Sequence, residues 1–223
     1  MLRHRFLAAV ALLAAAAPAA ASAQAFEYPA FQPPRVTETR EYNFAFADGA
    51  SSTSLVFQWR EGYGPGSQIS FDAGFGDVDG GDPALLVGGQ YAQQLTTADA
   101  SIPVDLALTV GANLALFTGD TPDGVLVRVP LGLVLGRTFV VDAPTGFAIT
   151  PYVHPRASLD YASGADDDKT DLGVNVDVGA NFRITPAFSG RLAFTLGGGD
   201  DDFFRGDAFG LSFALTPRAI NRR

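Results

Sequence analysis

Apolar and polar residues alternate along almost the whole chain after residue 40, and this period of two restricts the fold more than any other feature. Successive side chains of a β-strand point to opposite faces, so the alternation predicts strands with one apolar face. In one such segment, Val174 and Val176 share one face while Asn175 and Asp177 share the other. Ten segments carry the pattern: 41–47, 53–60, 67–76, 84–94, 103–117, 124–136, 147–161, 170–183, 187–197 and 207–216. No helical period follows residue 24, so the sequence predicts an all-β protein.

The composition of the polar face indicates which face of these strands is buried. That face consists of Gly, Ser, Thr, Asn and Asp with a few Arg, while Lys169 is the only lysine and 20 of the 24 acidic residues are Asp. Charged residues make up 17% of the chain against 47% hydrophobic residues, too little charge for a well-solvated exterior. A membrane barrel instead turns apolar residues to lipid and small polar residues to the lumen, and its closure leaves no unpaired edge. We therefore predict an antiparallel up-and-down transmembrane β-barrel, with a soluble periplasmic β-sandwich as the disfavoured alternative.

The first 23 residues have the three-part layout of a secretory signal peptide. Cationic Arg3 and Arg5 precede an apolar stretch over 6–17, and small residues lead to a predicted cleavage site after Ala23. Cleavage leaves 13 Lys+Arg against 24 Asp+Glu, a formal charge of −11, which disfavours a nucleic-acid partner. The absence of cysteine excludes a disulfide framework, so stability must come from packing and hydrogen-bonded closure.

The mature chain divides into three parts. Residues 24–39 contain Pro29, Pro33 and Pro34 and lack any period, so we predict an extended periplasmic lead-in. Residues 40–216 form the predicted barrel, and residues 217–223 form a C-terminal tail.

The distribution of acidic residues among the turns supports a barrel of ten strands. Successive hairpin turns alternate between the two rims, and the odd-numbered turns contain twelve aspartates: Asp48, Asp77, Asp79, Asp82, Asp120, Asp123, Asp166, Asp167, Asp168, Asp200, Asp201 and Asp202. The even-numbered turns contain only Asp99 and Asp142, with Glu61 beside them. A wrong strand count would scramble this division; barrels of eight or twelve strands are the remaining alternatives. With the N-terminus in the periplasm, the acidic odd turns are predicted to be extracellular.

The last predicted strand carries a family resemblance. Its sequence Gly210-Leu-Ser-Phe213-Ala-Leu215 has the form of glycine, two residues, an aromatic, one residue and a hydrophobic. In this element and in its strand pattern over about residues 40–216, the chain resembles the small outer-membrane β-barrel proteins of double-membraned bacteria, of the OmpA/OmpX kind. Those families usually end on the terminal aromatic residue, whereas this chain continues to Arg223. The resemblance implies insertion by the barrel assembly machinery into the outer membrane, in contact with lipid and lipopolysaccharide.

Few residues offer chemistry for catalysis or metal binding. His154 is the only histidine after cleavage, and Ser158 on the same strand face lies ~13 Å away, too far for a hydrogen-bonded dyad. We therefore predict no catalytic residue and no resident cofactor. Asp77, Asp79 and Asp82 resemble part of a calcium loop without its closing glutamate, which makes them weak metal candidates. Ca²⁺ or Mg²⁺ could also bridge the acidic loops to lipopolysaccharide phosphates.

The remaining polar candidates point into the predicted lumen. They form a charge network of Arg60, Asp72, Asp105, Arg128, His154, Arg156, Asp177 and Arg191. Arg156 and Asp177 are predicted to pair across the hairpin of segments 147–161 and 170–183. Because eight-stranded barrels are filled by side chains and much larger ones hold channels, ten strands predict a mostly filled lumen and a structural or surface-interaction role. The alternatives are a narrow passive channel for ions or small solutes and a barrel enzyme acting on lipid or peptide.

Overall fold

The computed structural model describes residue 26 and residues 28–78, 83–117, 124–163, 168–198 and 206–217. The predicted signal peptide and nearly all of the predicted tail lie outside these residues. The described chain contains eleven strands: β1 (Glu41–Gly49), β2 (Ser52–Gly62), β3 (Ser67–Val78), β4 (Ala84–Thr96), β5 (Asp105–Phe117), β6 (Val125–Gly136), β7 (Phe139–Asp142), β8 (Phe147–Ser163), β9 (Lys169–Thr185), β10 (Phe188–Gly198) and β11 (Ala208–Leu215). None of the described residues belongs to a helix long and apolar enough to cross a membrane.

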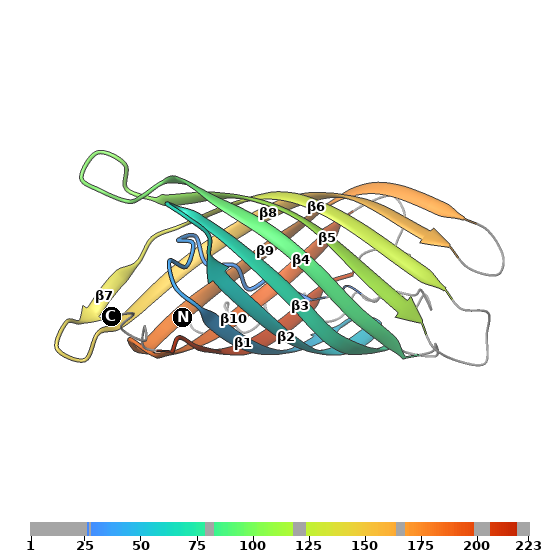
Figure 1. Ribbon diagram of the computed structural model, residues 1–223, viewed down its shortest axis with the longest axis horizontal. Coiled ribbons are helices and arrows are strands. Elements are labelled where there is room, and N and C mark those ends of the chain that lie inside the picture. The colour runs from blue at the N-terminus through green and yellow to red at the C-terminus, as the bar shows by residue number, and fades with distance from the viewer. Residues whose placement is uncertain are drawn as a thin grey trace, which may run out of the picture.

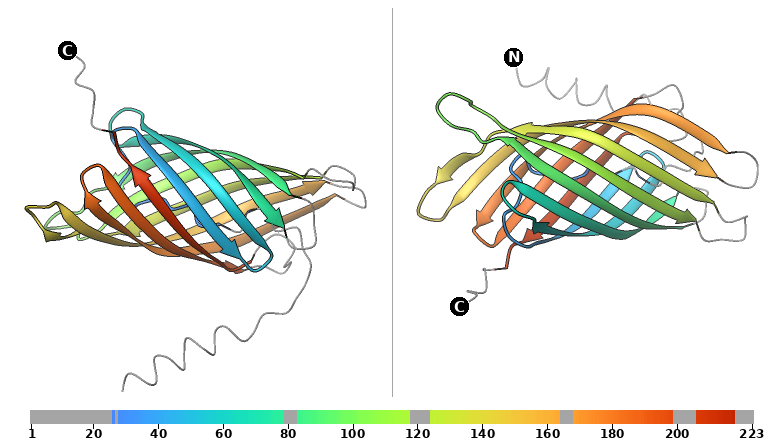
Figure 2. Two further views of the ribbon diagram at one scale, coloured as in Figure 1. Left: turned by 90° about the horizontal axis from the view of Figure 1, so that it is seen from below. Right: turned by 45° about the horizontal axis from the view of Figure 1, so that its top comes forward.

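Ten of these strands close into a single antiparallel ring (Figures 1 and 2). Neighbours in sequence pair with one another, and β1 closes the ring against β11 with Phe44 opposite Phe213. On the other side β6 pairs with β8, with Val129 opposite Leu159. The predicted up-and-down barrel of ten strands is therefore confirmed, and the alternatives of eight and twelve strands are wrong. Both ends of every predicted segment fall within two residues of an observed strand end.

The short strand β7 is a departure from the sequence prediction, which treated 137–145 as a turn. It pairs only with β8, placing Phe139 opposite Ile149 and Val140 opposite Ala148. Strand β8 begins at Phe147, but its pairing with β6 starts only at Tyr152. Without β7, the residues of β8 before Tyr152 would lack a partner on that side. Strand β7 supplies those hydrogen bonds, and its hairpin projects beyond the ring (Figure 1).

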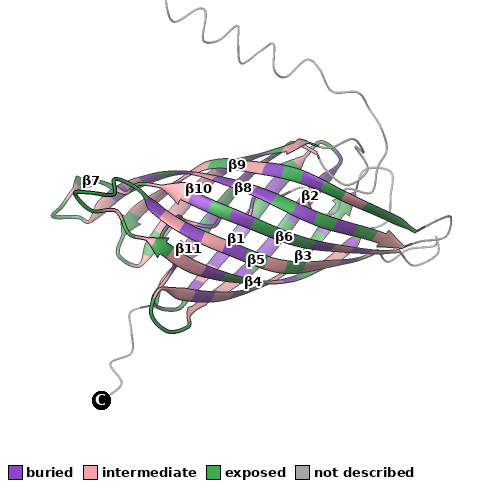
Figure 3. Ribbon diagram, turned by 90° about the horizontal axis from the view of Figure 1, so that it is seen from above, coloured by how far each residue is buried: buried purple, intermediate pink, exposed green. Residues whose placement is uncertain are grey.

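Burial alternates along the strands as the sequence pattern predicts (Figure 3). On β9, Leu172 is 73% exposed on the outside, whereas Asn175 and Asp177 are buried at 4% and 0% inside. Exterior aromatic residues pair between strands, with the rings of Phe44 and Phe57 5.0 Å apart. The barrel thus has an apolar exterior suited to lipid and a polar interior.

The two rims of the barrel carry different connections between strands. The terminal rim is where β1 begins at Glu41 and β11 ends at Leu215, and it carries the connections 63–66, 97–104, 137–146 and 186–187. The acidic rim carries the other connections; of its twelve aspartates, Asp48, Asp77 and Asp168 are described and the other nine lie outside the described residues.

Residue 26 and residues 28–37 lie inside the barrel. Residues 26 and 28–37, called here the N-terminal plug, contain no strand or helix, and Phe31 within them is completely buried (the blue segment of Figure 1). Side chains of six strands hydrogen-bond to the plug. The sequence predicts an extended periplasmic lead-in over residues 24–39, whereas residues 26 and 28–37 lie in the lumen, a position that no periodicity in the segment indicates.

Candidate functional site: the lumen and its plug

Asp177 on β9 is the centre of the lumenal contacts. Its Oδ1 accepts hydrogen bonds from Arg156 Nη2 at 2.7 Å and from Thr195 Oγ1 at 2.8 Å. Its Oδ2 accepts one from the backbone N–H of Ala30 in the plug at 3.1 Å. The predicted pairing of Arg156 with Asp177 is confirmed, although Arg156 lies opposite Asn175, so the pair is diagonal. The buried carboxylate of Asp177 on β9 therefore connects the two adjacent strands, β8 and β10, to the plug.

A second ion-pair group lies toward the terminal rim. Glu41 accepts from Arg60 Nη1 at 2.9 Å and from Arg191 Nη2 at 2.7 Å, and all three side chains are almost completely buried. Arg60 also donates through Nη2 to the backbone oxygens of Ala30 and Phe31, each at 3.1 Å. Buried charges need a partner and further hydrogen bonds to offset their desolvation, and here the plug backbone provides the further bonds.

A third contact holds the plug near the acidic rim. Arg128 on β6 forms a bidentate ion pair with Asp160 on β8, through Nε at 2.8 Å and Nη2 at 3.2 Å. Its Nη1 donates to the backbone oxygen of Phe26 at 3.2 Å, and its guanidinium lies 5.4 Å from the centre of the Phe26 ring. The first described residue of the plug is therefore bound at the opposite end of the barrel from the start of β1.

Glutamines hold the other end of the plug. Gln68 on β3 accepts from the backbone N–H of Thr37 and donates to Gln32 Oε1, at 2.8 and 2.9 Å. Gln94 on β4 accepts from the N–H of Val36 at 2.9 Å and donates to the carbonyl of Pro34 at 3.0 Å. Gln68 lies near the start of β3 and Gln94 near the end of β4, and both of these strand ends belong to the terminal rim. The plug therefore runs from one rim of the barrel toward the other.

Packing fixes the middle of the plug. Phe31 has a φ of +49°, in the left-handed region that non-glycine residues rarely adopt. Its ring lies against β11 at Gly210, where an added Cβ would be 2.5 Å from Phe31 Cζ and 3.1 Å from Pro29 Cδ. Gly210, the glycine of the element over residues 210–215 that carries the family resemblance, therefore also provides the space that the Phe31 ring occupies.

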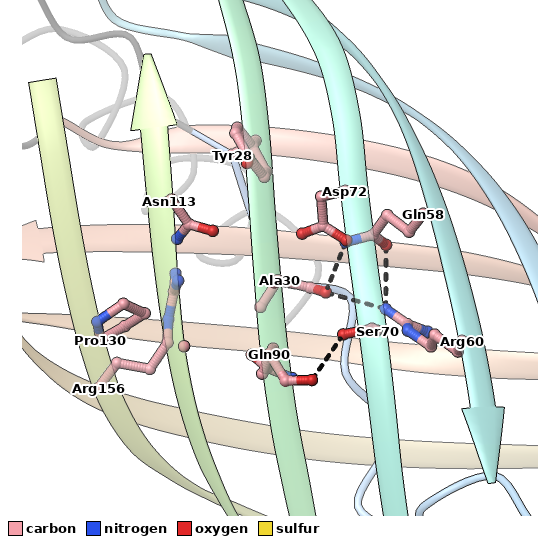
Figure 4. A pocket seen from close by; sticks show the side chains of 12 residues that line it. Tyr28, Ala30, Gln58, Arg60, Ser70, Asp72, Gln90, Asn113, Pro130 and Arg156 are labelled. Carbon is pink, nitrogen blue, oxygen red and sulfur yellow. Dashed lines mark hydrogen bonds between the residues drawn. The ribbon is translucent and has the colours of Figure 1, made fainter. Parts of the chain in front are cut away.

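A small central cavity lies between the plug and the wall at mid-height (Figure 4). A central cavity of about 20 Å³ is lined by Tyr28 and Ala30 of the plug and by wall residues that include Asp72, Asn113 and Arg156. This volume suits about one water molecule. Asp72 Oδ1 is buried there without a protein hydrogen-bond partner among the described residues, so a water at this point would satisfy it.

His154 lies in a hydroxyl–imidazole–carboxylate arrangement that the sequence did not predict. Its Nε2 is 2.9 Å from Thr109 Oγ1 on β5, and its Nδ1 is 3.5 Å from Asp177 Oδ2. Such an order of groups can activate a nucleophile when substrate reaches the hydroxyl. Here His154 is 0% and Thr109 2% exposed, Ala30 covers the carboxylate, and an added Cβ at Gly132 would be 2.6 Å from His154 Nε2. The arrangement is packed as a structural contact.

The weak metal candidates are not brought together in the described residues. Asp77 ends β3 with its side chain exposed, while Asp79 and Asp82 lie outside the described residues. Among the residues that the structure describes, no three His, Asp or Glu side chains converge on a point that could hold a metal ion.

The remaining network residues all lie on the lumenal side, with one placed near a rim. Asp105 starts β5 at the terminal rim and pairs with Arg35 of the plug at 3.1 Å. The prediction missed Glu41 and Asp160, the partners of three of its arginines. Both could have been found, because the alternation that assigned Asn43 and Arg156 to the inner face assigns Glu41 and Asp160 to it as well.

No family model and no curated protein sequence matches this chain. Solved barrels do resemble it in structure. The β domain of the Bordetella autotransporter BrkA is 11% identical, covering 81% of this chain and 100% of its own, with a TM-score of 0.46. The KdgM porin is 7% identical over 79% of this chain and 98% of its own, with a TM-score of 0.38, and Neisserial surface protein A is 15% identical over 79% and 95%, with a TM-score of 0.37.

The chain shares with these structures the architecture of a small closed antiparallel β-barrel. At these identities the likeness concerns the fold alone.

Proposed function

We propose that this protein is an integral outer-membrane β-barrel with a structural or surface-interaction role, whose lumen is closed by its own N-terminal plug. The observation that carries the proposal is the set of hydrogen bonds joining plug to wall at three levels: Arg128 near the acidic rim, Asp177 at mid-height, and Arg60, Gln68 and Gln94 toward the terminal rim. A segment bound to the wall along its length occupies the described part of the lumen and would obstruct the passage of solutes.

The charged groups of the wall support a closed lumen because they bind one another and the plug backbone. A pore lining would instead present charges to water and to passing solutes. The central cavity of about 20 Å³ is too small for a hydrated ion to pass. Transport and catalysis are therefore not part of the proposed role.

The apolar exterior supports a lipid-embedded location, and the signal peptide predicted over residues 1–23 supports export. Under this proposal the acidic rim faces outward, where Ca²⁺ or Mg²⁺ can bridge its aspartates to lipopolysaccharide phosphates. Insertion requires the barrel assembly machinery, as for other barrels of this architecture.

Single-channel recording in planar bilayers tests the proposal. The intact mature protein should insert without steady conductance, whereas a variant lacking residues 26–37 should conduct, because its charged lumen would fill with water. A variant lacking residues 217–223 is the matched control and should remain silent. Heat-dependent migration on a gel verifies that each variant is a closed barrel. Steady current through the intact protein, equal to that of the plug deletion, would show that the plug does not close the lumen.

A further inference from the structure

The mouth of the barrel at the terminal rim contains two adjoining hollows lined by arginines. The larger, about 500 Å³, is bounded by the 97–104 connection, the β7 hairpin and the plug; the smaller, about 220 Å³, lies beside it. Arg35, Thr138 and Arg183 line both hollows, and Arg137 lines the larger. We refer to the two hollows together as the vestibule. Its volume falls in the range of small-molecule sites.

Residues of the N-terminal plug form part of the vestibule lining. Pro33 and Pro34 line the smaller hollow, and Arg35 is fixed between the two by its ion pair with Asp105. A molecule in the vestibule would therefore contact the plug as well as the wall and, if the plug closes the lumen as proposed above, would be held at the mouth of the barrel.

Two arginines of the vestibule are held in place without a carboxylate. Arg183 Nε donates to the carbonyl of Gly146 at 3.0 Å, in the turn where Gly146 adopts a φ of +75°. The Arg137 guanidinium lies 5.6 Å from the centre of the Phe139 ring. Within the described part of the chain, neither guanidinium has a carboxylate at ion-pair distance. Each keeps terminal N–H groups free to donate, in the fork geometry that suits carboxylate and phosphate groups.

The three acidic residues that line the vestibule, Glu41, Asp99 and Asp105, are already engaged. Glu41 is paired with Arg60 and Arg191. Asp105 accepts from Arg35 and from the backbone N–H of Ala98, at 3.1 and 3.0 Å. Asp99 Oδ1 accepts from the N–H of Ile102 and from the N–H and hydroxyl of Ser101, each at 2.7 Å. These bonds, that of Ile102 first, lower the pKa of Asp99. The Asp99 carboxylate is thus occupied by hydrogen bonds from its own loop.

Charge on the rest of the chain makes this arrangement unusual. The protein carries a net charge of −9, and its aspartates are concentrated in the connections of the other rim. An anion is repelled from the acidic rim and attracted to a concave surface with exposed guanidinium groups. We propose that the vestibule is a binding site for a phosphate- or carboxylate-bearing small molecule, recognised by Arg137 and Arg183.

Calorimetric titration of the intact protein in a nonionic detergent tests the site, with inorganic pyrophosphate as the probe. The unchanged protein should bind it saturably, Arg137→Gln and Arg183→Gln should each weaken binding at least about tenfold, and the double variant should abolish it. Arg40→Gln is the matched control, since Arg40 is an exposed arginine before β1 that pairs with Glu61 at 2.6 Å and lines neither hollow. Both arginines lie at the rim, so the variants should keep the closed barrel, which heat-dependent migration verifies.

Competition distinguishes the sources of the anionic group. Displacement of pyrophosphate by short-chain phosphatidylglycerol, but not by phosphatidylcholine, would support the site and assign it to lipid headgroups. Displacement by citrate but by neither lipid would support it and assign it to soluble anions. Absence of saturable binding, or equal loss of binding in Arg40→Gln and the double variant, would overturn the proposal.

Discussion

Removing the carboxylate of Asp177 is expected to destabilise the barrel strongly. In Asp177→Asn the Arg156 side chain, 9% exposed, keeps its charge in the lumen without its counter-charge. Breaking a buried pair in this way costs about 3–5 kcal/mol of unfolding free energy. Thr195 donates to one carboxylate oxygen and Ala30 of the plug to the other. Asparagine keeps only one acceptor oxygen, and its NH2 group only donates, so these two bonds cannot both be kept.

A double-mutant cycle isolates the pair from these secondary losses. Arg156→Met should also destabilise, because Asp177 is then left with only its neutral donors and His154. The combined variant should be more stable than the sum of the two single effects predicts, by at least about 1 kcal/mol. Asp77→Asn, at an exposed end of β3, is the control for loss of a carboxylate and should change stability by less than about 0.5 kcal/mol.

Fluorescence provides the assay without further engineering. Trp59 is the only tryptophan, and its ring stacks on Phe71 across β2 and β3 with centroids 5.7 Å apart. Urea unfolding in detergent micelles, followed at Trp59, gives the free energy for each member of the cycle. Additive effects of the two substitutions would refute the reasoning, since groups bonded at 2.7 Å in a buried site should be coupled.

Three further predictions use the same stability assay or cell labelling. Val176→Arg places a cation on the lipid face of β9 and should cost about 2–4 kcal/mol, whereas Asn175→Gln in the lumen should cost much less; equal tolerance would argue against lipid outside the barrel. Gly210→Ala should cost about 1–3 kcal/mol because its Cβ meets the Phe31 ring, while Gly190→Ala, with nothing within 4 Å, should be nearly neutral; similar effects would mean that Phe31 does not pack there. Single cysteines at Ser52, Asp79, Asp167 and Asp201 should react with a membrane-impermeant maleimide on intact cells, and those at Gly64, Ala98, Thr145 and Ala187 should react only after lysis; the reverse pattern would invert the orientation.

The strands could be predicted because their pattern is local. Each barrel strand has one apolar and one polar face. Because successive side chains point to opposite faces, apolar and polar residues alternate along the sequence of every strand. The same period located Arg156 and Asp177 on the inner face closely enough to pair them. Strand β7 escaped prediction because Val140 and Val141 are adjacent apolar residues without alternation, and the strand forms only against the overhanging start of β8.

The position of the plug could not be read from a period, because an extended segment with three prolines has none. Its composition held a weaker signal. Phe26, Tyr28 and Phe31 place three aromatic rings within six residues, and a segment in periplasmic water gains nothing from that apolar area. The structure buries all three rings. Aromatic residues in an otherwise polar, proline-rich lead-in therefore indicated burial, although nothing in the sequence indicated where.

The plug also accounts for the polar character of the lumen wall. Prolines at positions 29, 33 and 34 have no N–H, so fewer plug donors require a partner inside the barrel. The N–H groups of Ala30, Val36 and Thr37 reach Asp177, Gln94 and Gln68. Carbonyls of Phe26, Ala30, Phe31 and Pro34 accept from Arg128, Arg60 and Gln94. The glutamines and charged groups of the wall thus hydrogen-bond to the N–H and C=O groups of the plug backbone. A water-filled pore would not require such partners at these positions. These bonds make the wall and the plug a single structural unit.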